Sequence, residues 1–506
     1  MVLLRCIYKF ILHKGRNMKE IKFPKNFLWG GAMSAEQTEG KGSTRKARTI
    51  FDEQFEKSPN DFFDNVGPGL TTDITKHYKE DIKLWKETGA NSIRTSISWA
   101  RIFPDGMDKE PSQDGVDFYK KFFKEMQDNG IEPIATLFHF DLPMYEYVKG
   151  GWGNREVWYD FLKYAKFIIN EFGDQIKTWV TMNEPWVPPN ASYIWAVYIP
   201  KEKNEQKAVN DAYGIVMAHA LVVNHFNEVV KQKYPDLEIG AIFNSSIVYP
   251  KDEKNPEDIK AAKYMDYFQF SGVTDPMISG KWPKGIKEWL LEMDLFPENF
   301  KQEDVETLSK VHVDLIGLNY YAPARAKAPS GDAKESKFGQ YFESYEMPGR
   351  RENKFRGWEI YPEAVYDTLK ILADKHGKDR KYMLTEYGMG VEGEGIFRNE
   401  EGIIEDDYRI AFIKEHLEFL NKAMYEEEIN VIGAHMWAIM DCWSWTNAFK
   451  NRYGLIEVDL QNKLKRTIKK SGLFMKELST TGAFNGEYKK MEEYMDFDSM
   501  EYSKSK

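Results

Sequence analysis

Short apolar stretches rich in β-branched and aromatic residues recur along the chain, and longer stretches with helical periodicity separate them. Eight of the short stretches have the length and composition of buried β-strands. In chain order they are Phe27–Met33, Asn91–Ser98, Pro133–Phe140, Lys177–Met182, Glu238–Asn244, Val313–Tyr320, Tyr382–Thr385 and Val431–Trp437. Two of the intervening segments, 155–172 and 406–424, repeat apolar residues at the i, i+3, i+4 spacing of an amphipathic helix.

The alternation of strand and helix predicts an α/β fold, a single (β/α)8 TIM barrel. Length alone would allow about three domains, but barrels of this kind exceed the usual domain size. A doubly wound open sheet is the structural alternative. That fold needs a glycine-rich phosphate-binding loop after its first strand, and the segment found here, GGAMSAEQTEG, is not such a loop.

Composition and charge exclude several classes of protein. The 506-residue chain has 70 Lys and Arg against 80 Asp and Glu, a net charge of −10, and no basic block, so nucleic acid is not an expected partner. Only two cysteines occur, Cys6 and Cys442, which excludes a disulfide framework and fits a reducing compartment. No stretch of 18 apolar residues is present, so we expect no membrane span.

Both ends of the chain differ from the segment between them. The apolar run in residues 1–17 is broken by Arg5 and Lys9, so we predict a disordered extension or a mis-assigned start before Met18. A weak amphipathic surface helix is the alternative for this segment. The barrel is predicted to occupy residues 18–485, and the charged stretch 486–506, which lacks aliphatic residues, is predicted to be disordered.

Polar or amphipathic residues stand at the end of every predicted strand. In a TIM barrel the carboxyl ends of the strands form the catalytic face, so these side chains are expected to converge on one aromatic-lined pocket. Any one of them taken alone is better explained as ordinary surface or core polarity. The residues are Gln37, Arg94, His139, Asn183, Glu184, Asn244, Asn319, Tyr321, Glu386 and Trp437.

Two of these residues, Glu184 and Glu386, are carboxylates in apolar surroundings at the fourth and seventh predicted strands. Either one alone could form a structural salt bridge or cap a helix. Facing each other, at roughly 5–5.5 Å for a retaining enzyme, they would suit cleavage of a glycosidic bond. Their repulsion would keep one protonated while Arg94 holds the other ionised. The motifs HExxH, CxxC, GxSxG and the Walker loop are all absent, so we expect no metal and no organic cofactor.

Six motifs spread over about residues 20–480 resemble those of glycoside hydrolase family 1, the β-glucosidase family. In the family's order they are FLWGGAMSAEQTEG, RTSISWARIFP, HFDLP, TMNEP, GLNYY and TEYG. The resemblance implies that Glu184 is the acid/base and that Glu386 is the nucleophile. Two positions depart from the family pattern: Tyr387 stands where Asn is usual, and Phe140 stands where many members have Trp.

The same resemblance implies roles for the residues around the two carboxylates. Gln37, His139 and Asn183 would bind sugar hydroxyls. Arg94 and Tyr321 would steady the nucleophile, and Trp437 would form a platform under the ring. The full set expected to bind the substrate is Gln37, Arg94, His139, Asn183, Asn319, Tyr321, Trp437 and Trp445.

A single position carries the clearest signal for specificity. Ordinary β-glucosidases of the family have Glu where this chain has Ser444, and a Glu there would repel a sugar 6-phosphate. The residues Ser444, Lys450 and Tyr453 resemble the phosphate-binding pattern of 6-phospho-β-glycosidases. In some relatives the lysine falls one residue later, at the position of Asn451, so the choice between Lys450 and Asn451 stays open. An ordinary charged surface loop is the alternative.

The function predicted from these residues is retaining hydrolysis of 6-phospho-β-D-glucosides, such as cellobiose 6-phosphate, with release of glucose 6-phosphate. Trp445 also occurs in phospho-galactosidases, so 6-phospho-β-galactosidase activity is one alternative, and an unphosphorylated β-glucosidase is another. A non-catalytic sugar-binding barrel is expected to have lost one carboxylate. The expected partner is a small phosphorylated β-glycoside in the cytoplasm, and the sequence does not indicate an oligomeric state.

Overall fold

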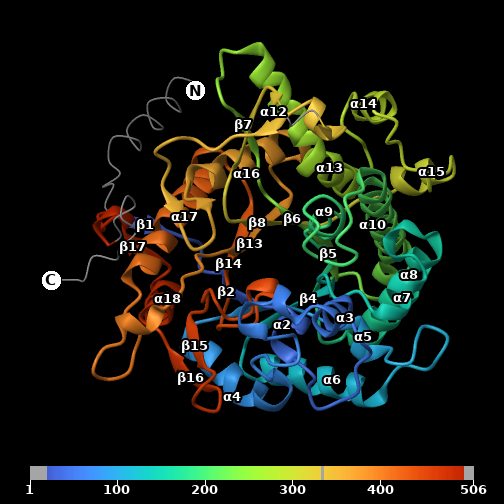
Figure 1. Cartoon of the computed structure of the whole chain (residues 1–506). Coiled ribbons are helices and arrows are strands. Elements are labelled where there is room, and N and C mark those ends of the chain that lie inside the picture. The colour runs from blue at the N-terminus through green and yellow to red at the C-terminus, as the bar shows by residue number, and fades with distance from the viewer. Residues whose placement is uncertain (1–19, 332–334, 495–506) are drawn as a thin grey trace, which may run out of the picture.

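Eight parallel strands close into a barrel in a computed structural model that describes residues 20–331 and 335–494 (Figure 1). Each strand pairs with the next in chain order, and the last pairs with the first, which confirms the predicted TIM barrel. The strands are β2 (Leu28–Ala32), β3 (Ser92–Ser96), β4 (Glu132–Phe138), β5 (Thr178–Asn183), β6 (Glu238–Asn244), β8 (Leu315–Tyr320), β13 (Lys381–Tyr387) and β14 (Val431–Trp437).

Helices surround the barrel on its outside, as the labels of Figure 1 show. The helical periodicity predicted two of them, α8 (Arg155–Phe172) and α17 (Asp407–Glu426), and both are observed. The other helices of nine residues or more are α4 (Ile74–Glu87), α6 (Gln113–Asp128), α10 (Glu205–His225), α12 (Pro256–Gln269), α13 (Ser271–Ser279), α16 (Glu363–His376) and α18 (Lys470–Thr481).

Helix α8 illustrates why these segments form helices. The Asn154 side chain accepts a hydrogen bond from the backbone N–H of Glu156 and so caps the first turn. Val157, Trp158 and Phe161 are completely buried, and they bring the apolar face of the helix against the rest of the core. The helix is therefore fixed by its cap and by burial of its apolar stripe.

Shorter helices lie mostly in the loops that follow the strands. They are α2 (Ala35–Glu39), α3 (Ile50–Lys57), α5 (Trp99–Ile102), α7 (Met144–Val148), α9 (Val187–Tyr193), α11 (Lys231–Lys233), α14 (Ile286–Glu292) and α15 (Asp304–Ser309). Additional short strands pair outside the barrel. They are β1 (Glu20–Lys22), β7 (Val248–Pro250), β9 (Ala324–Lys327), β10 (Glu343–Ser344), β11 (Glu352–Asn353), β12 (Trp358–Glu359), β15 (Ile456–Asp459), β16 (Lys465–Ile468) and β17 (Ala483–Asn485).

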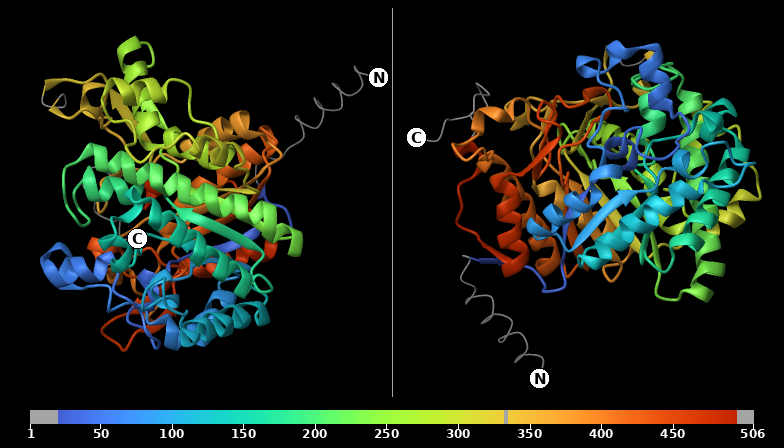
Figure 2. Two further views of the ribbon diagram at one scale, coloured as in Figure 1. Left: turned by 90° about the vertical axis from the view of Figure 1, so that its right-hand side faces the viewer. Right: turned by 90° about the horizontal axis from the view of Figure 1, so that it is seen from below.

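A small second core supports the part of the molecule that projects above the barrel in the left view of Figure 2. Helices α12 and α14 bury Met265 and Trp289 there, together with Ala326 from β9 and Phe338. Strand β9 pairs with β7 on one side and with β10 on the other. This layer comes from two barrel loops that are long enough to form a cluster of their own.

A buried ionic network holds the loops after β13 and β14. Arg409 of α17 pairs with Asp406 at 2.8 Å and also with Glu394. Lys469 bridges Glu394 at 2.5 Å and Asp441 at 3.0 Å. All five side chains are almost completely buried, and buried charges that pair in this way are costly to break singly. The network therefore fixes where each loop leaves its strand.

The chain was predicted to be disordered beyond residue 485, but residues 486–494 are ordered. Residues 486–494 pack against α17: Met491 is completely buried, its N–H donates to Glu415 Oε1 at 2.9 Å, and Tyr488 donates to Glu418 at 2.6 Å. The predictions for residues 1–17 and for 495–506 lie outside the described residues. Within the described ranges, no helix is both long and apolar enough to span a membrane.

Truncating the Met491 side chain tests this packing. We expect Met491→Ala to lower the free energy of unfolding by about 2–4 kcal/mol, because it leaves a cavity at a fully buried site. The exposed neighbour Lys489 supplies the control variant Lys489→Ala. Denaturant unfolding of both variants measures the difference, and equal stabilities would show that residues 486–494 do not pack here in solution.

Candidate active site

The carboxyl ends of the strands bring the predicted residues together, and two strands are irregular where they do so. The register of β5 against β6 shifts between Val180 and Asn183, and that of β13 against β8 shifts between Leu384 and Glu386. Such bulges re-aim the side chains that follow them. Glu184, directly after β5, also has a φ of 44°, a value rare for a residue with a side chain. Backbone strain of this kind collects at functional sites.

Glu386 is held at both of its oxygens. Arg94 donates to Oε1 from Nη2, and Tyr321 donates to Oε2 from its hydroxyl at 2.6 Å. Arg94 is completely buried, and Glu386 is 3% exposed. Burial lowers the pKa of Arg94 to about 10, which leaves it charged at neutral pH. A full positive charge and a hydroxyl donor therefore both stabilise the ionised form of Glu386.

Glu184 lies in a different environment. Its Oε1 accepts one hydrogen bond, from Asn319 Nδ2 at 2.9 Å. Burial raises the pKa of Glu184, and both the Asn319 hydrogen bond and the charge of Arg94 act in the opposite direction. Burial thus favours the protonated form of Glu184, whereas Arg94 and Tyr321 favour the ionised form of Glu386, and such opposed environments suit an acid beside a nucleophile.

Asn183 connects the two carboxyl groups. Its Oδ1 accepts from Arg94 Nη1 at 2.9 Å and from Asn319 Nδ2 at 3.1 Å, so its Nδ2 is the donor to His139 Nε2 at 3.2 Å. Burial and the nearby Arg94 lower the pKa of His139 well below its usual value, so its ring is neutral. A neutral ring that accepts at Nε2 carries its proton on Nδ1. One hydrogen-bonded chain thus runs from Glu184 to Glu386.

Aromatic rings form the walls of the site. The Trp437 and His139 rings stack with centroids 5.9 Å apart, and Trp445 lies 6.0 Å from His139. Tyr321 packs against Trp358, with 5.2 Å between the ring centroids. Trp358, on β12, is a wall residue that the sequence analysis missed. Its segment lies between two barrel strands and lacks any strand-end signal.

Two other predicted residues occupy separate positions. Gln37 is fully buried: its Nε2 donates to the carbonyl of Trp443 at 2.8 Å, and its Oε1 accepts from Ser34. This links the first barrel loop to the last one. Asn244 instead accepts a hydrogen bond from Ser246 at 3.3 Å, and its side chain makes no hydrogen bond to either carboxyl within the described chain.

The predicted phosphate ligands on the loop from Ser444 to Tyr453 differ in their surroundings. Ser444 and Tyr453 are buried, and neither hydroxyl bonds to another described residue. Asn451 is 1% exposed, and both ends of its amide lack partners within the described chain. The Lys450 Nζ lies 3.9 Å from Glu392 and 5.5 Å from the ring centroid of Phe63, with a side chain 37% exposed. The structure therefore places Lys450 at a surface ion pair.

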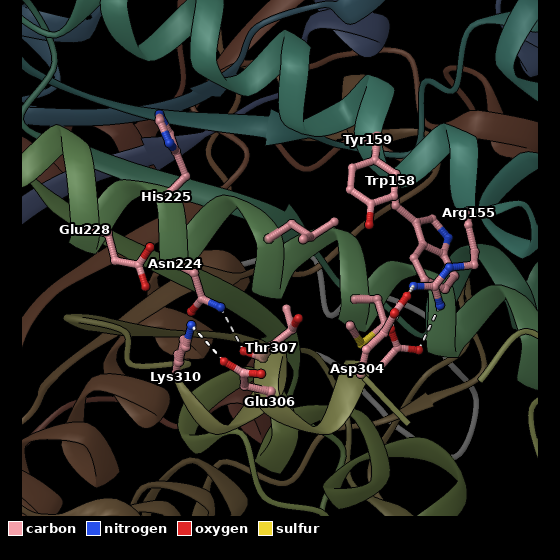
Figure 3. Close-up of a pocket in the computed structure, with 13 residues that line it drawn as sticks. Arg155, Trp158, Tyr159, Asn224, His225, Glu228, Asp304, Glu306, Thr307 and Lys310 are labelled. Atoms are coloured by element: carbon pink, nitrogen blue, oxygen red, sulfur yellow. Dashed lines mark hydrogen bonds and ion pairs between the residues drawn. The ribbon is translucent and has the colours of Figure 1, made fainter. Parts of the chain in front are cut away.

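A hollow lies on the outside of the barrel, against α8, α10 and α15 (Figure 3). Its volume is about 420 Å³, and its main charges pair with each other: Arg155 with Asp304 at 2.8 Å, and Lys310 with Glu306 at 3.4 Å. These side chains belong to surrounding helices, away from the strand ends. Among the described residues, no three or more His, Cys, Asp or Glu side chains are grouped to hold a metal ion.

Comparison with known proteins identifies relatives whose similarity extends over almost the whole chain. The model of glycosyl hydrolase family 1 matches residues 19–484. The 6-phospho-beta-glucosidase GmuD of Bacillus subtilis (strain 168) is 42% identical over 92% of this chain and 99% of its own. A 6-phospho-beta-galactosidase of Leptotrichia buccalis is 32% identical over 91% and 99%. The structure of a family 1 β-glucosidase from Thermotoga maritima matches with a TM-score of 0.82 at 29% identity, covering 92% and 99%.

The raised pKa of Glu184 predicts a pH-dependent stability. The folded protein holds this proton more strongly than the unfolded chain, so the stability that it contributes is full below about pH 4.5 and is lost as the pH rises through the folded pKa. Glu184→Gln removes the ionisation. We therefore expect this variant to melt higher than the wild type at about pH 8 and to lose that advantage toward about pH 5.

Thermal melts of both proteins across this range measure the effect. Glu306→Gln, at a carboxylate whose side chain is 78% exposed, is the matched control. A melting-temperature difference for Glu184→Gln that does not change with pH contradicts the assignment of a raised pKa.

Proposed function

The chain belongs to glycosyl hydrolase family 1, and from this premise we propose that it hydrolyses 6-phospho-β-D-glucosides with retention, releasing glucose 6-phosphate. The observation that carries the phosphate assignment is Ser444, a buried hydroxyl without a partner among the described residues, on the same loop as Tyr453, whose buried hydroxyl also lacks one. The 42% identity to a 6-phospho-beta-glucosidase supports it.

Glu386 acts as the nucleophile in this proposal. Its ionised carboxylate, stabilised by Arg94 and Tyr321, attacks the anomeric carbon and forms a glycosyl ester as the bond to the leaving oxygen breaks. Glu184, whose protonated form is favoured by burial, donates its proton to that oxygen. The aglycone then departs as an alcohol, and Glu184 is left ionised.

The second step returns both carboxyls to their starting states. Glu184 removes a proton from a water molecule, and that water attacks the anomeric carbon from the face that the aglycone has left. The ester bond to Glu386 breaks, so the sugar leaves with its original configuration. Once Glu386 is again ionised, Arg94 and Tyr321 hold it in place.

Electrostatics favours a phosphorylated sugar over a plain one. A glutamate at position 444 would place a carboxylate beside a doubly charged phosphate, and each pair of unit charges at 4 Å costs about 1 kcal/mol even in water. A serine hydroxyl instead supplies a donor. The gluco configuration is favoured over the galacto one because GmuD is 42% identical and the galactosidase 32%.

The competing functions make different demands on the same residues. An unphosphorylated β-glucosidase is expected to have a glutamate at 444, and this chain has Ser444. A sugar-binding barrel without activity needs only one of the two carboxylates, whereas Glu184 and Glu386 both occupy the site. Because phosphorylated glycosides form when sugars are phosphorylated on import, we place the enzyme in the cytoplasm. The proposed steps use protein side chains and water alone.

Substrate preference tests the phosphate assignment. We expect the wild type to hydrolyse 4-nitrophenyl β-glucoside 6-phosphate at least about 100-fold faster, in kcat/KM, than the unphosphorylated glucoside, with the galacto 6-phosphate in between. Ser444→Glu should remove most of that preference by repelling the phosphate. Faster turnover of the plain glucoside by the wild type overturns the proposal, and an unchanged preference in Ser444→Glu places the phosphate elsewhere.

Replacing the nucleophile tests the mechanism. Glu386→Gln keeps the size of the side chain but removes its charge, so kcat should fall by about 10⁴-fold or more on every substrate. Glu415→Gln, at a buried carboxylate on α17 outside the site, is the control for the loss of a buried charge. Steady-state assays with nitrophenyl glycosides measure the difference, and wild-type activity in Glu386→Gln rules out the two-glutamate mechanism.

A further inference from the structure

Arg356 lies in the excursion between β8 and β13, two residues before Trp358 and in the tight connection from β11 to β12. Its guanidinium carbon is 4.4 Å from the centroid of the Trp358 ring. Trp358 in turn packs on Tyr321, whose hydroxyl holds Glu386. Two aromatic side chains, those of Trp358 and Tyr321, therefore separate the charge of Arg356 from Glu386.

The guanidinium of Arg356 has no carboxylate partner among the residues that the structure describes. It forms no ion pair and no side-chain hydrogen bond with any residue of the described chain, and its Nε is buried without a partner. Three other arginines of this excursion pair with carboxylates: Arg325 with Glu359 at 2.7 Å, Arg350 with Glu352 at 2.9 Å, and Arg351 with Glu415 at 2.9 Å. A partly buried cation without an anion is unfavourable, so binding of an anion from outside the chain would stabilise the Arg356 guanidinium.

Two tyrosines show which part of the site Arg356 faces. Burial raises the pKa of both Tyr198 and Tyr453, and the positive charge of Arg356 opposes the rise in each. Tyr198 is also affected by the charge of Glu184, whereas Tyr453 packs with Trp437 and Cys442 on the loop that carries Ser444. Trp358, on which the guanidinium stacks, packs against the same cluster as Tyr453, so Arg356 lies on the side of the site that Tyr453 lines.

The cation that the sequence pattern indicates, Lys450, is directed elsewhere. Its ammonium group lies between Glu392 and the ring of Phe63 at the surface, so its charge is already shared with a carboxylate. Asn451, the other candidate, is neutral. Arg356, which has no carboxylate partner among the described residues, is thus the candidate cation for a dianionic phosphate that contacts Tyr453 and Ser444.

We propose that Arg356 is a specificity-determining residue that binds the 6-phosphate of the substrate, together with the Tyr453 and Ser444 hydroxyls. A guanidinium presents two parallel N–H donors that match two phosphate oxygens, and stacking on Trp358 fixes the plane of that fork. This inference rests on the proposed function, because it names a further residue of the same phosphate site.

The test compares two substrates that differ only in the phosphate: 4-nitrophenyl β-glucoside 6-phosphate and 4-nitrophenyl β-glucoside. Arg356→Met should lower kcat/KM for the phosphorylated substrate about 30- to 100-fold, mainly through KM, and leave the plain glucoside within about twofold. Arg356→Lys keeps the charge without the fork and should lose about 5- to 10-fold. Arg350→Met, in the same excursion, is the matched control and should change neither substrate.

Inhibition by glucose 6-phosphate and by glucose supplies a readout that is independent of the leaving group. Arg356→Met should weaken inhibition by glucose 6-phosphate by a factor similar to its loss in kcat/KM and leave inhibition by glucose unchanged. Thermal melts of each variant check that the fold is intact. If Arg356→Met does not fold, Arg356→Lys and the same inhibition series decide the question.

Each remaining outcome overturns the inference in a distinguishable way. Equal losses on both substrates assign Arg356 to the aglycone or to the structure of the wall. A loss of phosphate preference in Lys450→Met, with Arg356→Met unaffected, returns the role to Lys450. A wild type without preference for the phosphorylated substrate defeats the proposed function and this inference together, whereas preference retained in Arg356→Met defeats only the inference.

Discussion

The buried contact between Arg94 and Glu386 is the interaction on which the rest of the site depends. A carboxylate that is 3% exposed needs a full positive charge nearby, and a completely buried guanidinium needs a carboxylate in return. Because Arg94 also donates to Asn183, the same side chain orders the amide that holds Asn319 and His139. The position of Glu184 follows from Asn319. One ion pair thus anchors the hydrogen-bonded chain that positions both carboxyls.

The barrel supplies the precision that this network requires. Arg94, Asn183, Asn319 and Glu386 all belong to β-strands, which are the most constrained part of the fold. The loop from Ser444 to Tyr453 is different, since it lies beyond β14 and its backbone has positive φ at Trp445 and Ala448. The ionic network around Arg409 and Lys469 stabilises that loop from below. Most of the residues around the two carboxyls therefore lie on strands, whereas the proposed phosphate ligands Ser444 and Tyr453 lie on a loop held by buried charges.

The sequence predicted those parts of the molecule whose patterns are local. All eight barrel strands and helices α8 and α17 follow from apolar runs and helical periodicity, and the strand-end rule places Glu184 and Glu386 at one face. The wall formed by Trp358 and Arg356 was missed because its two-residue strands have no periodicity to detect. The direction of Lys450 and the packing of Met491 depend on partners far away in the chain, Phe63 and Glu415, which no local pattern indicates.

The closure of the barrel joins the beginning of the described chain to its end. Strand β2 pairs with β14, and β1 pairs with β17 through Glu20 opposite Asn485. During synthesis by the ribosome, β2 therefore keeps one edge open until β14 has been made, more than four-fifths of the way along the chain. An unpaired strand edge is a site of association with other chains. The topology thus leaves this edge of β2 without its native partner until the last barrel strand has been made.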